Sequence, residues 1–104
     1  QLTVAGTISA KNVNSLSDIN LKTNIKQIET PIEKVLKLKG VTFNWTSDNE
    51  PSVGVIAQNV EEVFPELVGT TIPKTVNYDG LIGLLIEAIK EQQAQIEELK
   101  NLRT

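Results

Sequence analysis

The feature that most constrains this chain is a long heptad pattern at its C-terminal end. Side chains suited to a helix seam recur every three or four residues, at Ile82, Leu85, Ile89, Gln92, Ile96, Leu99 and Arg103. A helix over residues 80–104 would form a rod of roughly 36 Å, at about 1.5 Å per residue. After Ile89 the apolar stripe is narrow and is bordered by Glu, Gln and Lys, which is typical of a coiled coil. The pattern therefore predicts that this helix packs against helices of other chains.

The same pattern leaves two points open. Leu81, Leu84 and Ile86 widen the apolar face at the start, so the first turns are expected to pack on the chain's own domain. The alternative is that the whole helix packs on its own domain. Ile and Leu at alternating seam positions favour two strands, but Gln92 at a seam position weakens that inference. The heptads alone do not decide between a dimer and a trimer.

Composition also favours association with other chains. The 104 residues are 39% hydrophobic but only 4% aromatic, so a small core of Val, Ile and Leu is expected. The sequence contains no cysteine and no histidine, which excludes disulfides and removes the usual zinc ligands. We therefore expect no metal or cofactor, and we expect oligomerisation to supply the extra burial.

Charge and hydropathy narrow the partners further. A net charge of −3 argues against a nucleic-acid-binding domain, which would carry a basic patch. No apolar run approaches the roughly 18 residues that span a membrane. We expect neither nucleic acid nor membrane as a partner. Because the sequence begins at Gln1 and contains no methionine, we expect it to be a piece of a longer protein.

Local patterns predict an α+β fold with a small three-stranded antiparallel sheet, short helices and the long C-terminal helix. The expected elements are a strand over residues 2–10, helices over 18–29 and 31–39, hairpin strands over 41–46 and 52–57, a short helix over 58–64, a third strand over 74–78, and the final helix with Asp79 as its cap. The second helix has a Thr30 cap, Pro31 in its first turn and Gly40 after its end. Val41, Phe43 and Trp45 are expected to face inward.

The residue types present exclude most catalytic arrangements. Without histidine and cysteine there is no Ser-His-Asp triad and no thiol chemistry. Gly80 and Gly83 lack the spacing of a phosphate-binding glycine loop. Glu61, Glu62 and Glu66 could form an acid–base pair, but nothing distinguishes them from a solvated helix face. The arrangement that remains is a serine activated by a lysine.

Ser17 and Lys22 are the candidates for such a pair, at the expected start of the helix over residues 18–29. On a continuous helix, residues five apart are separated by about 140° of rotation. A cap residue, however, folds its hydroxyl over the first turn, and helical side chains lean toward the N-terminus. The same helix end would offer N–H groups to an oxyanion. The alternative is an ordinary helix cap beside a surface lysine.

Several motifs occur in the order found in one known family. They are Ser17-Asp18 with Leu21-Lys22-Thr23-Asn24-Ile25, then Gly40-Val41-Thr42-Phe43-Asn44-Trp45, Gly54-Val55-Ile56-Ala57-Gln58-Asn59-Val60, Phe64-Pro65-Glu66-Leu67-Val68, Val76-Asn77-Tyr78-Asp79 and Leu84-Leu85-Ile86-Glu87-Ala88-Ile89-Lys90. Over about residues 15–100 the chain thus resembles the self-cleaving intramolecular chaperone domain at the C-terminus of phage tail fibres, tailspikes and endosialidases. It departs from the family at Ile19-Asn20, where relatives often carry a charged residue.

The resemblance implies a homotrimer that holds the upstream fibre shaft of the same polypeptide together while the shaft folds, and then releases itself. It implies that Ser17 is the nucleophile, Lys22 the general base, Leu16–Ser17 the scissile bond, and Asp18 a residue that positions the turn. Residues 1–16 would then be the end of the shaft. Residues 17–104 would be the auto-processing domain, with 80–104 as a trimeric coiled coil.

By the same resemblance, the activity would be a single-turnover serine endopeptidase acting on its own chain. The precursor would be a virion tail fibre or tailspike made in the host cytoplasm, with the chaperone part released after the cut. Two alternatives remain. One is a structural trimerisation module that does not cleave, and the other is a coiled-coil adaptor that forms dimers or hetero-complexes.

Overall fold

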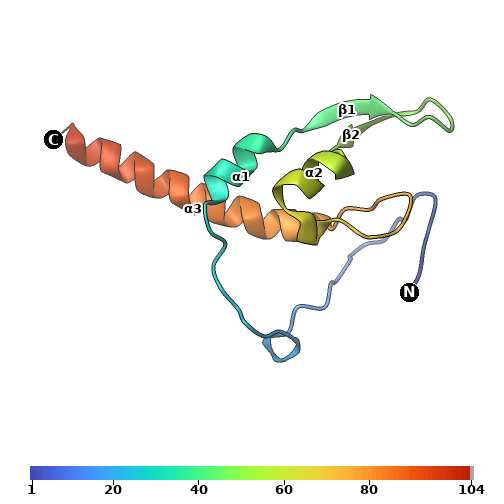
Figure 1. The fold of residues 1–104 in the computed structure, drawn as a ribbon, viewed down its shortest axis with the longest axis horizontal. Helices are drawn as coiled ribbons and strands as arrows, with labels where there is room; N and C mark the ends of the chain where they lie inside the picture. Colours follow the sequence, from blue (N-terminus) through green and yellow to red (C-terminus); the bar gives the residue numbers. More distant parts are fainter. Residues whose placement is uncertain (104) are drawn as a thin grey trace.

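A single long helix, α3 (Tyr78–Leu102), is the axis on which the rest of the fold is assembled (Figure 1). The structure is a computed structural model that describes residues 1–103. Asn77 caps α3, since its side-chain oxygen accepts the Gly80 N–H at 3.3 Å and so satisfies a donor that the first turn leaves unpaired. The expectation that Asp79 would be the cap is wrong, because Asp79 lies within the first turn.

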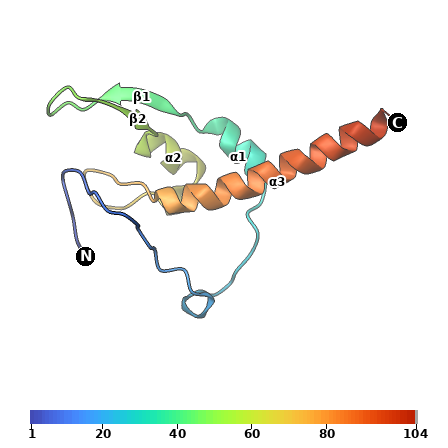
Figure 2. The same ribbon diagram turned by 180° about the vertical axis from the view of Figure 1, so that it is seen from behind.

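Short elements precede α3 in the order η1 (Ile19–Leu21), α1 (Pro31–Lys37), β1 (Val41–Asn44), β2 (Pro51–Gly54), α2 (Ala57–Val63) and η2 (Pro65–Leu67). The two strands form an antiparallel hairpin in which Val41 lies opposite Gly54. The hairpin and both short helices are confirmed, each within a few residues of its expected bounds. In both views α1, the hairpin and α2 lie along one side of α3, and the chain around η1 lies on the other (Figures 1 and 2).

Two expected strands are not formed. Residues 2–10 adopt no strand, because a strand needs a neighbouring strand for its backbone hydrogen bonds and this segment has none beside it in the single chain. Over residues 74–78 only Val76 forms a bridge, with Val68. The sheet of the described residues therefore has two strands instead of three.

The helix expected over residues 18–29 is replaced by η1 and an irregular segment. Asn24 has a left-handed backbone with φ of 52°, which is incompatible with a continuous helix. The apolar side chains of Ile19, Leu21 and Ile25 are exposed, and only Ile28, near the end of this range, packs against the core, so most of the expected helix would have no packing surface. A helix of about 12 residues is marginal without such packing.

Helix α1 begins without the predicted threonine cap. Thr30 has a left-handed backbone with φ of 46°, and its side chain makes no capping hydrogen bond. Pro31 has no N–H to satisfy, and the Ile32 N–H donates to the Glu91 carboxylate of α3 at 3.5 Å. Helix α3 therefore supplies the hydrogen-bond acceptor for the first turn of α1 that the Thr30 side chain does not supply.

The core is small and lies where α2 and η2 meet the first half of α3. Val60 and Leu84 are fully buried, and Leu67 and Leu81 pack beside them. Trp45 was expected to face inward, but 55% of it is exposed and it packs edge-on against Phe43 with ring centroids 5.0 Å apart.

The overall dimensions show that the chain alone is elongated. Its radius of gyration is 17.2 Å, whereas a compact domain of 100 residues has about 13 Å. The C-terminal half of α3 extends away from the other elements (Figures 1 and 2). Among the described helices, none combines the length and the apolar character needed to cross a bilayer.

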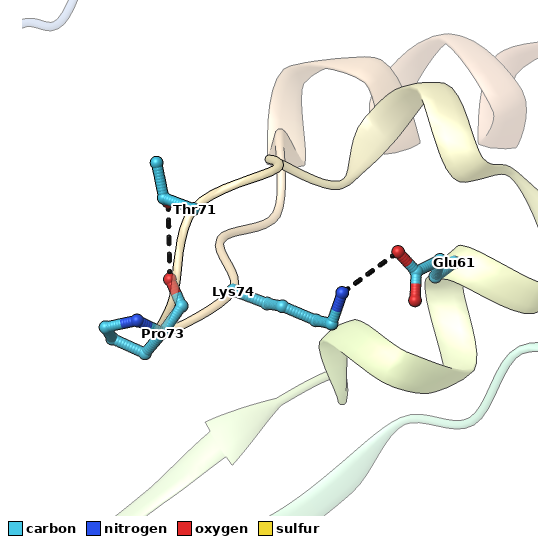
Figure 3. A network of polar contacts seen from close by, with 4 residues as sticks. All are labelled: Glu61, Thr71, Pro73 and Lys74. Carbon is cyan, nitrogen blue, oxygen red and sulfur yellow. Dashed lines mark hydrogen bonds and ion pairs between the residues drawn. The ribbon is translucent and has the colours of Figure 1, made fainter.

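The loop between η2 and α3 is tied to α2 by a polar contact (Figure 3). The Lys74 ammonium lies 3.1 Å from the Glu61 carboxylate, and the Thr71 hydroxyl donates to the Pro73 carbonyl at 3.4 Å. The Lys74 and Glu61 side chains are 33% and 44% exposed, so this pair contributes at most about 1 kcal/mol. Its main effect is to hold the loop near α2.

Two glycines of α3 are expected to respond in opposite ways to replacement by alanine. A Cβ at Gly80 would lie 2.0 Å from a methyl carbon of buried Leu67, so Gly80→Ala forces a shift in the core that costs about 1–3 kcal/mol. A Cβ at Gly83 meets only Ile28, at 4.0 Å, so Gly83→Ala gains helix propensity of about 1 kcal/mol. Urea unfolding at one protein concentration measures both, and destabilisation by Gly83→Ala or stabilisation by Gly80→Ala would contradict the packing.

Candidate functional site

The Ser17 hydroxyl and the Lys22 amine are in direct contact. Lys22 Nζ donates a hydrogen bond to Ser17 Oγ at 2.8 Å. The two residues flank η1, and the backbone is extended on both sides of this turn, with ψ of 134° at Asp18 and φ of −123° at Lys22. The structure thus brings together the two residues that the sequence singled out, across one tight turn instead of over a helix end.

Asp18 fixes this turn. Its carboxylate accepts the Asn20 N–H at 2.8 Å, and its carbonyl accepts the Leu21 N–H at 3.0 Å. The turn closes where the Lys22 N–H donates to the Ile19 carbonyl at 3.1 Å. Because Asp18 is the cap, and not Ser17 as expected, the Ser17 hydroxyl remains available to Lys22.

The Ser–Lys pair lies in an open pocket of about 550 Å³ between the upstream segment and the start of α3. Its lining residues are Ser15, Leu16, Ser17 and Lys22 from the first segment and Asn77, Asp79, Gly80 and Ile82 from the second. The Leu16 side chain, directly before Ser17, is 90% exposed. Lys22 is also exposed in the single chain, and among the described residues it forms no ion pair.

A second contact joins the two walls of this pocket. The Ser15 hydroxyl donates to the Asp79 carboxylate, across 64 positions of sequence. Sequence reasoning missed this contact, because it assigned Asp79 to capping. In the structure Asn77 caps α3, and this leaves the Asp79 carboxylate free to accept the Ser15 hydroxyl.

Two other expectations about this site change. Residues 18–29 form no helix, so the helix end that was expected to offer N–H groups to an oxyanion is not formed, and the Asn20 and Leu21 N–H groups of η1 donate to Asp18 instead. Glu61, Glu62 and Glu66 do not line the pocket, and Glu61 pairs with Lys74. The described geometry therefore gives no support to a carboxylate pair as the reactive groups.

Comparison with known proteins shows the family of the chain. A peptidase family described as "Chaperone of endosialidase" matches residues 17–69, which is about half of the chain and begins at Ser17. The chain belongs to this family, so the resemblance that the sequence motifs indicated is confirmed.

Individual relatives are more specific about the kind of protein. The chain is 37% identical to the Long tail fiber protein Gp37 of Enterobacteria phage K3 and to that of Enterobacteria phage T2, over 90% of its own length and 8% of theirs. It is 35% identical to the Long tail fiber protein Gp37 of Salmonella phage S16, over 91% of its length and 14% of that protein. The chain thus spans only a small part of the length of these curated relatives.

Proposed function

We propose that this chain is the auto-processing chaperone domain of a phage fibre. Three copies associate through α3, hold the upstream segments of their own polypeptides together while these fold, and then cut the bond between Leu16 and Ser17. The observation that carries the proposal is the 2.8 Å contact between Ser17 and Lys22, at the residue where the family match begins. The names of the relatives support a place on a virion tail fibre.

The exposed seam of α3 supports assembly. Leu81, Leu84 and Ala88 face the chain's own core and are buried. The neighbouring stripe is exposed over its whole length, with Ile82 at 56%, Leu85 at 47%, Ile89 at 65%, Ile96 at 45% and Leu99 at 61%. Apolar residues repeated at this spacing are buried when helices pack as a coiled coil. One face of α3 therefore holds the domain, and the adjacent face is left for other copies.

The position of Ile82 links assembly to cleavage. Ile82 is the first residue of the seam and also lines the pocket of Ser17 and Lys22. A helix from a second copy that packs on the seam would lie beside this pocket and reduce the exposure of Lys22 to water. An amine accepts a proton only when it is neutral, and exclusion from water favours the neutral form. We therefore propose that Lys22 becomes an effective base in the assembled trimer.

The reaction is a transfer of the Leu16 acyl group to Ser17 and then to water. Neutral Lys22 takes the proton of the Ser17 hydroxyl, and Oγ attacks the Leu16 carbonyl carbon. The bond from that carbon to the Ser17 nitrogen breaks, and Lys22 passes its proton to the nitrogen. Water hydrolyses the resulting ester, which leaves a carboxylate on Leu16 and restores the Ser17 hydroxyl. Because the hydroxyl is tethered beside its own preceding carbonyl, no approach in solution is required.

A time course on freshly folded chain tests the proposal. Light scattering should report a trimer, and a denaturing gel should show a product shorter by the sixteen residues before Ser17, without added protease. A stable trimer that stays uncut would instead favour the structural trimerisation module. A dimer or a hetero-complex would favour the adaptor, and both outcomes would contradict the proposed activity.

A further inference from the structure

Among the described residues, one hydrogen bond joins the segment before Ser17 to the rest of the domain. The Ser15 hydroxyl donates to the Asp79 carboxylate of α3. Within the described part of the chain, no other hydrogen bond joins residues 1–16 to the domain. The remaining side chain at this point, Leu16, is 90% exposed and gives little packing. The placement of the Leu16 carbonyl therefore depends on the anchoring of Ser15.

The Asp79 carboxylate is available to bind Ser15 because another residue caps α3. Asn77 satisfies the first turn of α3 through the Gly80 N–H. The start of the helix is itself fixed against buried Leu67, which lies so close to Gly80 that no Cβ fits there. A carboxylate on a fixed helical turn is a rigid acceptor, and hydrogen bonds to charged groups are stronger than those between neutral groups.

We propose that Asp79 is a positioning residue for the cleavage reaction, because it binds the residue two places before the new N-terminus. By holding Ser15, it keeps the Leu16 carbonyl beside Ser17 and Lys22 in the shared pocket. This inference rests on the proposed function. It also defines a specificity: the upstream chain needs a hydroxyl at position 15, which serine and threonine supply and alanine does not.

Asp79 has a second effect that must be separated from this one. An acidic residue in the first turn of a helix stabilises the helix through the backbone dipole, whatever the upstream segment does. That effect does not involve Ser15. A double-substitution cycle between positions 15 and 79 therefore distinguishes the two, because only direct contact makes their effects non-additive.

Cleavage rates after refolding give the first test. We expect Ser15→Ala and Asp79→Ala each to slow cleavage about tenfold, and the double variant to be no slower than either. Ser15→Thr should keep most of the rate because it keeps the hydroxyl. Glu98→Ala, an exposed carboxylate further along α3, serves as the control and should not change the rate. Effects at positions 15 and 79 that multiply, or a slow Ser15→Thr, would overturn the proposal.

A second readout does not depend on cleavage. In chains carrying Ser17→Ala, we expect backbone NMR order parameters of about 0.8 at residues 15 and 16. They should fall below about 0.6 when Asp79→Ala is added. Unchanged order parameters would overturn the anchoring role. If the unsubstituted chain never cleaves but the order parameters fall as expected, the proposed function fails while the contact stands. If cleavage occurs and the order parameters do not fall, the anchoring role alone fails.

Discussion

Ser17→Ala is expected to leave the chain uncut, with a loss of at least about 10³-fold in cleavage rate. Alanine removes the attacking oxygen but leaves η1 intact, since Asp18 caps that turn. Lys22→Ala should have a similar effect, because no other amine contacts Ser17 Oγ among the described residues.

Lys22→Arg tests the role of base more specifically than Lys22→Ala. Arginine keeps a positive donor for Ser17, but its guanidinium does not give up its proton, so it cannot act as a base.

Two matched variants control for general damage to the fold. Ser47→Ala removes an exposed hydroxyl from the hairpin loop, and Lys26→Ala removes an exposed amine four residues after Lys22. Both should cleave at the rate of the unsubstituted chain. All variants should remain trimeric by light scattering. Efficient cleavage by Lys22→Arg or Lys22→Ala would contradict the assignment of Lys22 as the base. Efficient cleavage by Ser17→Ala would contradict the assignment of Ser17 as the nucleophile.

Ile89→Asp is expected to turn the trimer into monomers and to stop cleavage with it. The Ile89 side chain is 65% exposed in the single chain, so the substitution leaves the packing of the domain unchanged. In a coiled-coil seam it would bury a carboxylate from every copy without a partner, at a cost of several kcal/mol for each charge. Assembly at micromolar concentration should therefore be lost, whereas the helix content of the single chain is largely retained.

Ala94→Asp is the matched control, because position 94 lies on the far side of α3 from the seam and is exposed. Sedimentation should find Ala94→Asp trimeric and Ile89→Asp monomeric, and circular dichroism should find both helical. A trimeric Ile89→Asp would place the interface elsewhere. Monomeric Ile89→Asp that cleaves at the normal rate would show that the Ser–Lys pair works without the assembly.

The elements that sequence patterns predict well here are those whose partners are local. The hairpin of β1 and β2 follows from turn residues between two short apolar strands, and α3 follows from its period. The elements that were predicted wrongly would need packing partners, and a local sequence pattern does not show whether such partners are present. Among the described residues, 2–10 have an alternating pattern but no neighbouring strand, and 18–29 have helical spacing but leave Ile19, Leu21 and Ile25 exposed.

The candidate site divides in the same way. Ser17 and Lys22 are five residues apart, so a local argument was enough to predict that they meet, although the turn between them differs from the helix expected. The partner of Asp79 could not be found in this manner. Its contact with Ser15 spans 64 positions and depends on how the upstream segment lies across the start of α3. Propensity and spacing carry no information about such a crossing.

The central claim is that Ser17 attacks the carbonyl of Leu16, and the most direct test is the mass of the two products. Purified trimer incubated with hydroxylamine, which intercepts esters, should give one fragment that ends in a Leu16 hydroxamate and one that begins at Ser17 with a free amine. A cut at any other bond would contradict the claim. So would a chain of full mass after prolonged incubation of a verified trimer.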